Sequence, residues 1–270
     1  MRTDPAPFSA AAAHACTSAQ RVVELVAQLS DTCNRLRIAH AFLRTVESYP
    51  DAPATIELLV GTPSAGIDQL ILRDLPATKR RAALHHRLAN VTTYTAAYGN
   101  RVVIRHGRIG RLGEHARYAR LLLERAGQRT IGTVTCLTPS RSDHLLLLAM
   151  HQLYTRPAFR LSDVLCAVEA IRQGQIDWDY LFATALSMGI VPVVGCYLQY
   201  LDRIHRSLAH RSLVPADTLA RFETSGGEQG PARLYLQHVR ATLESGRWHS
   251  AARLSLVPVM AALTASRRTA

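Results

Sequence analysis

Residues 55–60 read Thr-Ile-Glu-Leu-Leu-Val, and this run ends at Gly61-Thr-Pro. A short apolar and β-branched run that is closed by glycine and proline predicts a β-strand. The stretch Arg101-Val-Val-Ile-Arg105 predicts a second strand, and weaker runs at residues 67–72 and 130–137 predict two more. The first half of the chain is therefore expected to build a β-sheet.

The sequence from Pro139 onward changes to helical patterns. Polar residues that predict helix starts, and glycines that predict helix ends, are Ser142, Ser162, Asp177, Gly174 and Gly189. Residues 191–208 predict a longer helix, and two more are expected near the end of the chain. The sequence thus predicts an α+β protein, with a sheet domain at residues 1–138 and an all-helical domain at residues 139–270.

Three more segments of the first domain have recognisable patterns outside the expected strands. Thr17 is expected to cap an N-terminal helix that runs through Val22 and Leu29, and residues 79–89 predict a basic helix. Residues 36–46 fit either a helix or a strand. Helices are therefore expected on both sides of this ambiguous segment in the chain.

The composition indicates a globular chain with a basic balance. Hydrophobic residues make up 48% and charged residues 19%, which excludes a disordered protein. The net charge is +12, and Lys79 is the only lysine beside many arginines. A basic, arginine-rich chain favours anionic partners such as nucleotides, nucleic acid or acidic protein, and does not choose among them.

The cysteines and the apolar segments bear on the compartment. The five cysteines include no Cys-x-x-Cys pair, so neither a cysteine zinc site nor a disulfide framework is indicated. The N-terminal sequence lacks the features of a secretory signal, and the most apolar stretches are too short to span a bilayer. We expect a soluble cytoplasmic protein that does not enter the membrane.

An ordered set of motifs links the loop after residue 105 to the helical half. The motifs are Arg-Ile-Gly-Arg-Leu-Gly-Glu-His at 108–115, Pro-Ser-Arg-Ser-Asp-His at 139–144, His151, Phe-Arg-Leu-Ser-Asp at 159–163 and Ile-Asp-Trp-Asp-Tyr-Leu at 176–181. Over roughly residues 36–201 this order resembles the uncharacterised nucleotidyltransferase family of bacteria. The resemblance implies a small mixed sheet of the polymerase-β type followed by a helical domain. It also implies transfer of a nucleotidyl group from an NTP with Mg²⁺.

The resemblance places the metal-binding acids on the strand at residues 55–60. The family pattern is Asp-x-Asp, and two acids at this spacing share one face of a strand and can share a metal. Here Thr55 stands at the first position and Glu57 at the second. Glu57 is thus the expected catalytic residue and Mg²⁺ ligand. No Asp or Glu lies between Asp74 and Glu114 to supply the third acid. In a second register, which starts at Gly61, Asp68 would be the catalytic acid.

The same acid-free window is rich in arginine and histidine. Candidate nucleotide or phosphate contacts are Arg105, His106 and Arg108 in this window and Arg44 before it. A phosphate-binding face and a solvated basic surface both fit this pattern. The glycines at residues 107–113 could approach an anion closely, or form a tight connection to the next helix.

Two functions follow from these residues. One is a nucleotidyltransferase-family protein that binds nucleotides, with weak or lost nucleotidyl transfer. The other is an inactive binding or regulatory protein that holds an anionic macromolecule on an arginine-rich face. Nucleic-acid binding rests on charge alone. His144, His151, Asp143 and Asp163 would suit a metal cluster, but capping by Asp143 and a partly buried histidine explain the same residues.

Overall fold

The computed structural model describes residues 6–43, 55–61, 65–96, 99–154, 161–222, 231–244, 246, 248–252 and 254–255. The chain divides into two compact units. Unit 1 is drawn from residues 1–82, 91–107 and 123–139, and unit 2 from residues 83–90, 108–122 and 140–270. The units therefore differ from two continuous halves, because two segments before residue 139 belong to unit 2.

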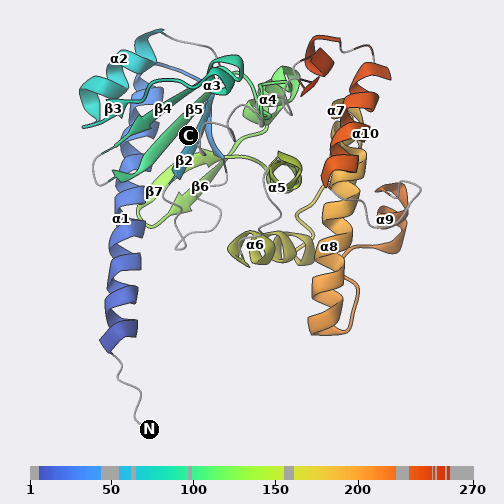
Figure 1. Ribbon diagram of the computed structural model, residues 1–270. Helices are drawn as coiled ribbons and strands as arrows, with labels where there is room; N and C mark the ends of the chain where they lie inside the picture. Colours follow the sequence, from blue (N-terminus) through green and yellow to red (C-terminus); the bar gives the residue numbers. More distant parts are fainter. Residues whose placement is uncertain are drawn as a thin grey trace, which may run out of the picture. The chain divides into compact units, whose positions relative to one another are not determined.

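Unit 1 contains a five-stranded mixed sheet (Figure 1). Its strands are β1 (His40–Leu43), β2 (Thr55–Val60), β3 (Thr78–Lys79), β4 (Val91–Thr95) and β5 (Arg101–His106). They are ordered β1-β2-β5-β4-β3, with β2 and β5 parallel and the other neighbours antiparallel. The α+β class and the strands at residues 55–60 and 101–105 are confirmed.

Two helices cover one face of this sheet. Alternate side chains of the strands, among them Ile56, Leu58, Tyr94, Val102 and Ile104, join the core of unit 1. The helices α1 (Ala6–Arg35) and α2 (Ala65–Asp74) bury their apolar stripes in the same core. Successive residues of a strand point to opposite faces, so the intervening side chains of β2 and β5 lie on the other face.

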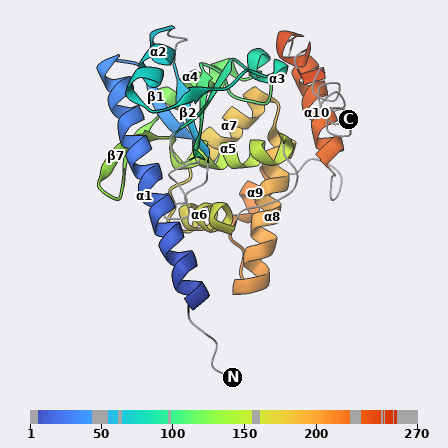
Figure 2. The same ribbon diagram turned by 60° about the vertical axis from the view of Figure 1, so that its left-hand side comes forward.

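A hairpin completes unit 1. It consists of β6 (Gly127–Ile131) and β7 (Val134–Thr138), which pair antiparallel, where the sequence predicted one strand at residues 130–137. β7 contacts both α1 and β1, and both views show α1 running beside it (Figures 1 and 2). Ile131 and Cys136 extend the core of unit 1 toward this hairpin.

Some predicted elements of unit 1 are wrong. The strand expected at residues 67–72 is part of helix α2, because Ile67, Ile71 and Leu75 recur at helical spacing and are all buried. The basic helix expected at residues 79–89 shrinks to α3 (Leu84–Leu88), which belongs to unit 2, and Lys79 lies in strand β3.

Two further differences concern the ends of elements. Thr17 lies inside α1 rather than at its start. The ambiguous segment at residues 36–46 contains strand β1, and β4 was not predicted at all. These differences leave the two strands that carry the predicted site residues unchanged.

Unit 2 is helical. Its helices are α3, α4 (Ala116–Glu124, whose last two residues count with unit 1), α5 (Arg141–Tyr154), α6 (Leu161–Arg172), α7 (Trp178–Met188), α8 (Val191–Ala209), α9 (Ala216–Phe222) and α10 (Pro231–Glu244). Residues 248–252 are helical as well. Within the part of the chain that the structure describes, no helix has the length and apolar character needed to cross a membrane.

The predicted helix starts of unit 2 are right at Asp177 and shifted at Ser142 and Ser162, which lie inside α5 and α6. The Asp177 side chain accepts a hydrogen bond from the backbone N–H of Tyr180 at 3.0 Å, so it caps α7. Gly189 ends α7 in the left-handed conformation with φ 71°. α5 is capped by Ser140, whose Oγ accepts from the Asp143 N–H at 3.2 Å, and not by Ser142.

Candidate functional site

Glu57 lies on the face of the sheet opposite α1 and α2. Its register partners are Leu43 on β1 and Val103 on β5. Because side chains two residues apart on a strand share a face, Arg101 and Arg105 flank Val103 on this side. We call the set Thr55, Glu57, Arg101, Val103 and Arg105 the Glu57 face.

The charges on the Glu57 face are unequal. Arg105 Nη2 and Glu57 Oε1 form an ion pair at 3.7 Å, and their side chains are 22% and 25% exposed. Arg101 lies two residues before Val103, and its Nε is buried with no hydrogen-bond partner among the described residues. The face therefore holds two guanidinium groups against one carboxylate and has an excess of positive charge.

This arrangement does not fit a two-metal nucleotidyl-transfer site. Mg²⁺ prefers clustered oxygen ligands, at least some of them carboxylates. The strand beside Glu57 instead presents Arg101, Val103 and Arg105, and two positive charges repel a cation. Among the described residues, the one group of three metal-ligating side chains lies elsewhere. Glu47 and Asp51, the two acids that shortly precede β2 in the sequence, fall outside the described residues.

Asp68, the alternative catalytic acid, lies on the other side of the sheet from Glu57. Its carboxylate accepts hydrogen bonds from Lys79 Nζ at 2.5 Å and from the Tyr94 hydroxyl, and Tyr94 belongs to the helix-covered core. Burial alone would raise the pKa of Asp68, but the hydrogen bonds from Lys79 and Tyr94 outweigh it, and the pKa is lowered. Asp68 and Glu57 are therefore not brought together.

The predicted phosphate contacts are scattered in the same way. Arg105 is on the Glu57 face, whereas His106, the next residue, points to the helix-covered side and contacts Thr92 through Nε2 at 3.0 Å. Burial lowers the pKa of His106. Arg108 belongs to unit 2, where its Nη1 donates to the Gly113 carbonyl at 3.0 Å. Arg44 lies outside the described residues.

The glycine-rich loop closes around a glutamate rather than around an open anion site. Glu114 Oε1 accepts from the backbone N–H of Arg111 at 3.2 Å, and Oε2 accepts from that of Leu112 at 2.9 Å. Gly110 has φ 106°, and a Cβ there would lie 2.3 Å from the Glu114 Cδ. The loop therefore requires glycine at this position, both for its backbone conformation and for space.

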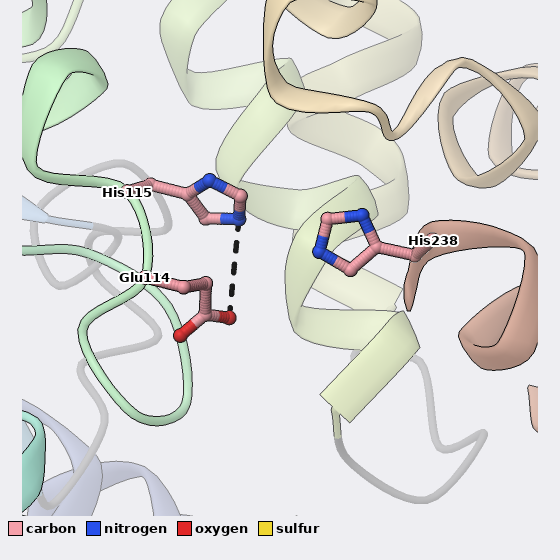
Figure 3. A group of neighbouring side chains, drawn as sticks. All are labelled: Glu114, His115 and His238. Carbon is pink, nitrogen blue, oxygen red and sulfur yellow. Dashed lines mark ion pairs between the residues drawn. The ribbon is translucent and has the colours of Figure 1, made fainter. Parts of the chain in front are cut away.

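Glu114 is also part of a buried cluster with two histidines (Figure 3). One ligand atom from each of Glu114, His115 and His238 lies within 4.8 Å of the others, and Glu114 Oε1 is 3.8 Å from His115 Nε2. All three residues are at least 94% buried and belong to unit 2. Sequence reasoning missed this cluster, because nothing in the chain links the Glu-His pair to a histidine on α10.

Of the four residues considered for a metal cluster in the helical half, Asp143 has structural contacts instead. The Asp143 carboxylate accepts from the Ser140 hydroxyl at 2.5 Å and from the Tyr180 hydroxyl at 2.6 Å. Within the described residues, the metal-ligating group of three does not include His144, His151 or Asp163. Asp143 thus links the start of α5 to α7.

No protein-family model matches the sequence, and no curated protein matches it either.

Proposed function

We propose that this protein is nucleotidyltransferase-like and binds a nucleotide or another phosphate-bearing ligand on the Glu57 face, without a metal and with weak or lost nucleotidyl transfer. One observation carries the proposal. Beside Glu57, where metal catalysis needs further acids, β5 presents Arg101, Val103 and Arg105. A face with this charge suits a phosphate better than a cation.

The family part of the proposal is supported by the sequence resemblance and by a mixed sheet that helices cover on one face. A fold does not imply a reaction, so the activity has to be argued from the site. The site offers guanidinium donors for phosphate and a single carboxylate for metal. We therefore propose binding rather than turnover, with Mg²⁺ dispensable.

The ion pair between Glu57 and Arg105 makes the proposal testable by the sign of an effect. A bound phosphate would compete with the Glu57 carboxylate for Arg105. Removing the charge of Glu57 should then strengthen binding. If Glu57 were instead a metal ligand, the same change would abolish binding of the metal–nucleotide complex.

Isothermal titration calorimetry with each NTP and with inorganic triphosphate tests the proposal, in Mg²⁺ and in EDTA. We expect EDTA to have little effect, Arg105→Ala to weaken binding about tenfold or more, and Glu57→Gln to tighten it several-fold. Arg240→Ala is the matched control, because it removes one positive charge from an exposed ion pair on α10.

Three results would overturn the proposal. They are Mg²⁺-dependent binding that Glu57→Gln abolishes, equal weakening by Arg240→Ala and Arg105→Ala, and no binding by the wild type. Thermal unfolding of each variant shows whether a loss of binding reflects a loss of folding.

Binding of an acidic macromolecule is a second candidate. It is favoured by Arg80 and Arg81, which are exposed directly after the edge strand β3. Such binding would fall steeply with ionic strength and would need Arg80 and Arg81 rather than Arg105. Titration with heparin and with a duplex oligonucleotide, in the wild type and in the Arg80→Ala/Arg81→Ala variant, separates the two functions.

A further inference from the structure

We infer that Glu114, His115 and His238 form a binding site for one divalent first-row transition-metal ion, of which Zn²⁺ is the representative. The site is independent of the proposed phosphate binding, because it lies in unit 2 while the Glu57 face lies in unit 1. Its three ligand atoms lie within 4.8 Å of one another in a buried setting.

The donor set determines the class of ion. Two imidazoles and one carboxylate are a ligand combination of zinc and of other first-row transition metals. Mg²⁺ and Ca²⁺ prefer oxygen ligands and are poorly served by histidine. The site is therefore unlike the magnesium site that the sequence resemblance implies at Glu57.

The surroundings of His238 orient its ring for this role. His238 Nδ1 lies 3.0 Å from the carbonyl oxygen of Gly189. Because a carbonyl only accepts hydrogen bonds, Nδ1 carries the proton, and the neutral ring has its lone pair on Nε2. Figure 3 shows the other ring nitrogen of His238 pointing toward His115 and Glu114. Metal-binding histidines characteristically donate their second nitrogen to such a carbonyl.

The glycine-rich loop holds Glu114 in an equivalent way. Backbone N–H groups of Arg111 and Leu112 donate one to each carboxylate oxygen. A carboxylate oxygen accepts more than one interaction, so these bonds position the group without excluding a metal. Burial of a carboxylate is costly unless it is compensated, and a bound cation would compensate it.

The ligand atoms lie within 4.8 Å of one another and would have to move closer together on metal binding. Zinc bonds of about 2.0–2.1 Å place tetrahedral ligands roughly 3.3 Å apart. The Glu114–His115 separation of 3.8 Å would shorten by about half an ångström. Three protein ligands leave a fourth tetrahedral position for a water molecule or another small ligand.

Metal binding to the purified protein tests this inference. The chain is first treated with EDTA and then titrated with Zn²⁺ in calorimetry and with Co²⁺ in visible absorption spectroscopy. We expect one ion per chain, the intense visible bands of tetrahedral Co²⁺, and a higher melting temperature with Zn²⁺.

Histidine variants provide the specificity control. His238→Gln and His115→Gln should each weaken binding at least about 100-fold. His205→Gln is matched to His238→Gln, because His205 is also buried and its Nδ1 contacts a backbone carbonyl, that of Arg211, at 3.0 Å. It should bind the metal like the wild type. A Glu114 variant cannot serve in this comparison, because Glu114 also accepts the backbone hydrogen bonds of its loop.

Three outcomes would overturn the inference. They are no stoichiometric binding by the wild type, equal loss in His205→Gln and His238→Gln, and near-ultraviolet thiolate-to-Co²⁺ bands. Such bands would place the ion on a cysteine instead. None of these measurements depends on NTP binding, so the metal site and the proposed function are tested independently.

Discussion

Glu57 and Glu114 both lie in sequence motifs that suggest a functional role, but their surroundings in the fold differ. Glu57 stands on a strand, is 25% exposed in its side chain and faces Arg105. Glu114 is buried, and its two carboxylate oxygens accept the backbone N–H groups of a glycine-rich loop. A motif thus identifies an acid as a candidate functional residue, while its burial and hydrogen-bond partners determine its role.

The largest expected effect contrasts these two glutamates directly. Glu114→Ala should lower the free energy of unfolding by about 3 kcal/mol or more, because two loop N–H groups lose their acceptor and a cavity forms. Glu57→Ala should change it by about 1 kcal/mol or less, as for a partly exposed ion pair. Urea denaturation in EDTA measures both values. Equal losses would contradict the contrast.

Asp68 provides an intermediate case, because it is a carboxylate with charge-assisted partners on the helix-covered side of the sheet. Asp68→Asn should cost about 2 kcal/mol at pH 7. Asp31→Asn is the control on the neighbouring helix α1, since its side chain is 68% exposed, and it should change stability by about 0.5 kcal/mol or less.

The effect of Asp68→Asn should depend on pH. The folded-state pKa of Asp68 is lowered below its unfolded value of about 3.9. The carboxylate therefore stabilises the fold fully above that unfolded value, and the contribution is lost as the pH falls through the folded pKa. The unfolding free energies of the wild type and the variant, measured by denaturation at each pH, should therefore become similar below about pH 4. A constant difference down to pH 2 would refute this assignment.

The smallest expected effect concerns a carboxylate that is more exposed than Glu57 but bonded to backbone like Glu114. Asp177→Ala should cost about 1 kcal/mol, because the Tyr180 N–H at the start of α7 loses its cap. Asp179→Ala, two residues later, removes an 89% exposed acid paired with Arg221 and should cost a few tenths of a kcal/mol. Thermal denaturation ranks the two, and the reverse order would show that capping is not what Asp177 contributes.

The parts of the fold that could be predicted are those with a local cause. The β-branched runs at residues 55–60 and 101–105 gave strands, and Asp177 with Gly189 marked both ends of α7. The sequence predicts a strand where α2 lies, because the apolar run from Leu70 to Leu72 masks the helical spacing of Ile67, Ile71 and Leu75. Propensity in so short a run is a weak guide, and packing against the core decides.

The candidate sites likewise differ in how far local sequence could predict them. Glu57 and Arg105 could be nominated from one strand each, but their pairing depends on a parallel register that joins distant segments. Asp68 could not be separated from Glu57 in the sequence, because nothing local shows which face of a sheet an acid will reach. The Glu114–His238 contact spans most of unit 2 in sequence and has no motif, so only the folded chain brings it together.

The alternation of the chain between its two units limits how the protein can be divided. Tyr118, in the segment 108–122, donates its hydroxyl to the Asp143 carbonyl, and the Ser250 hydroxyl donates to that of Glu114. A fragment that ends at residue 139 would keep that segment of unit 2 and lose both of these contacts. A single breakpoint in the chain therefore cannot exchange either unit as an intact piece.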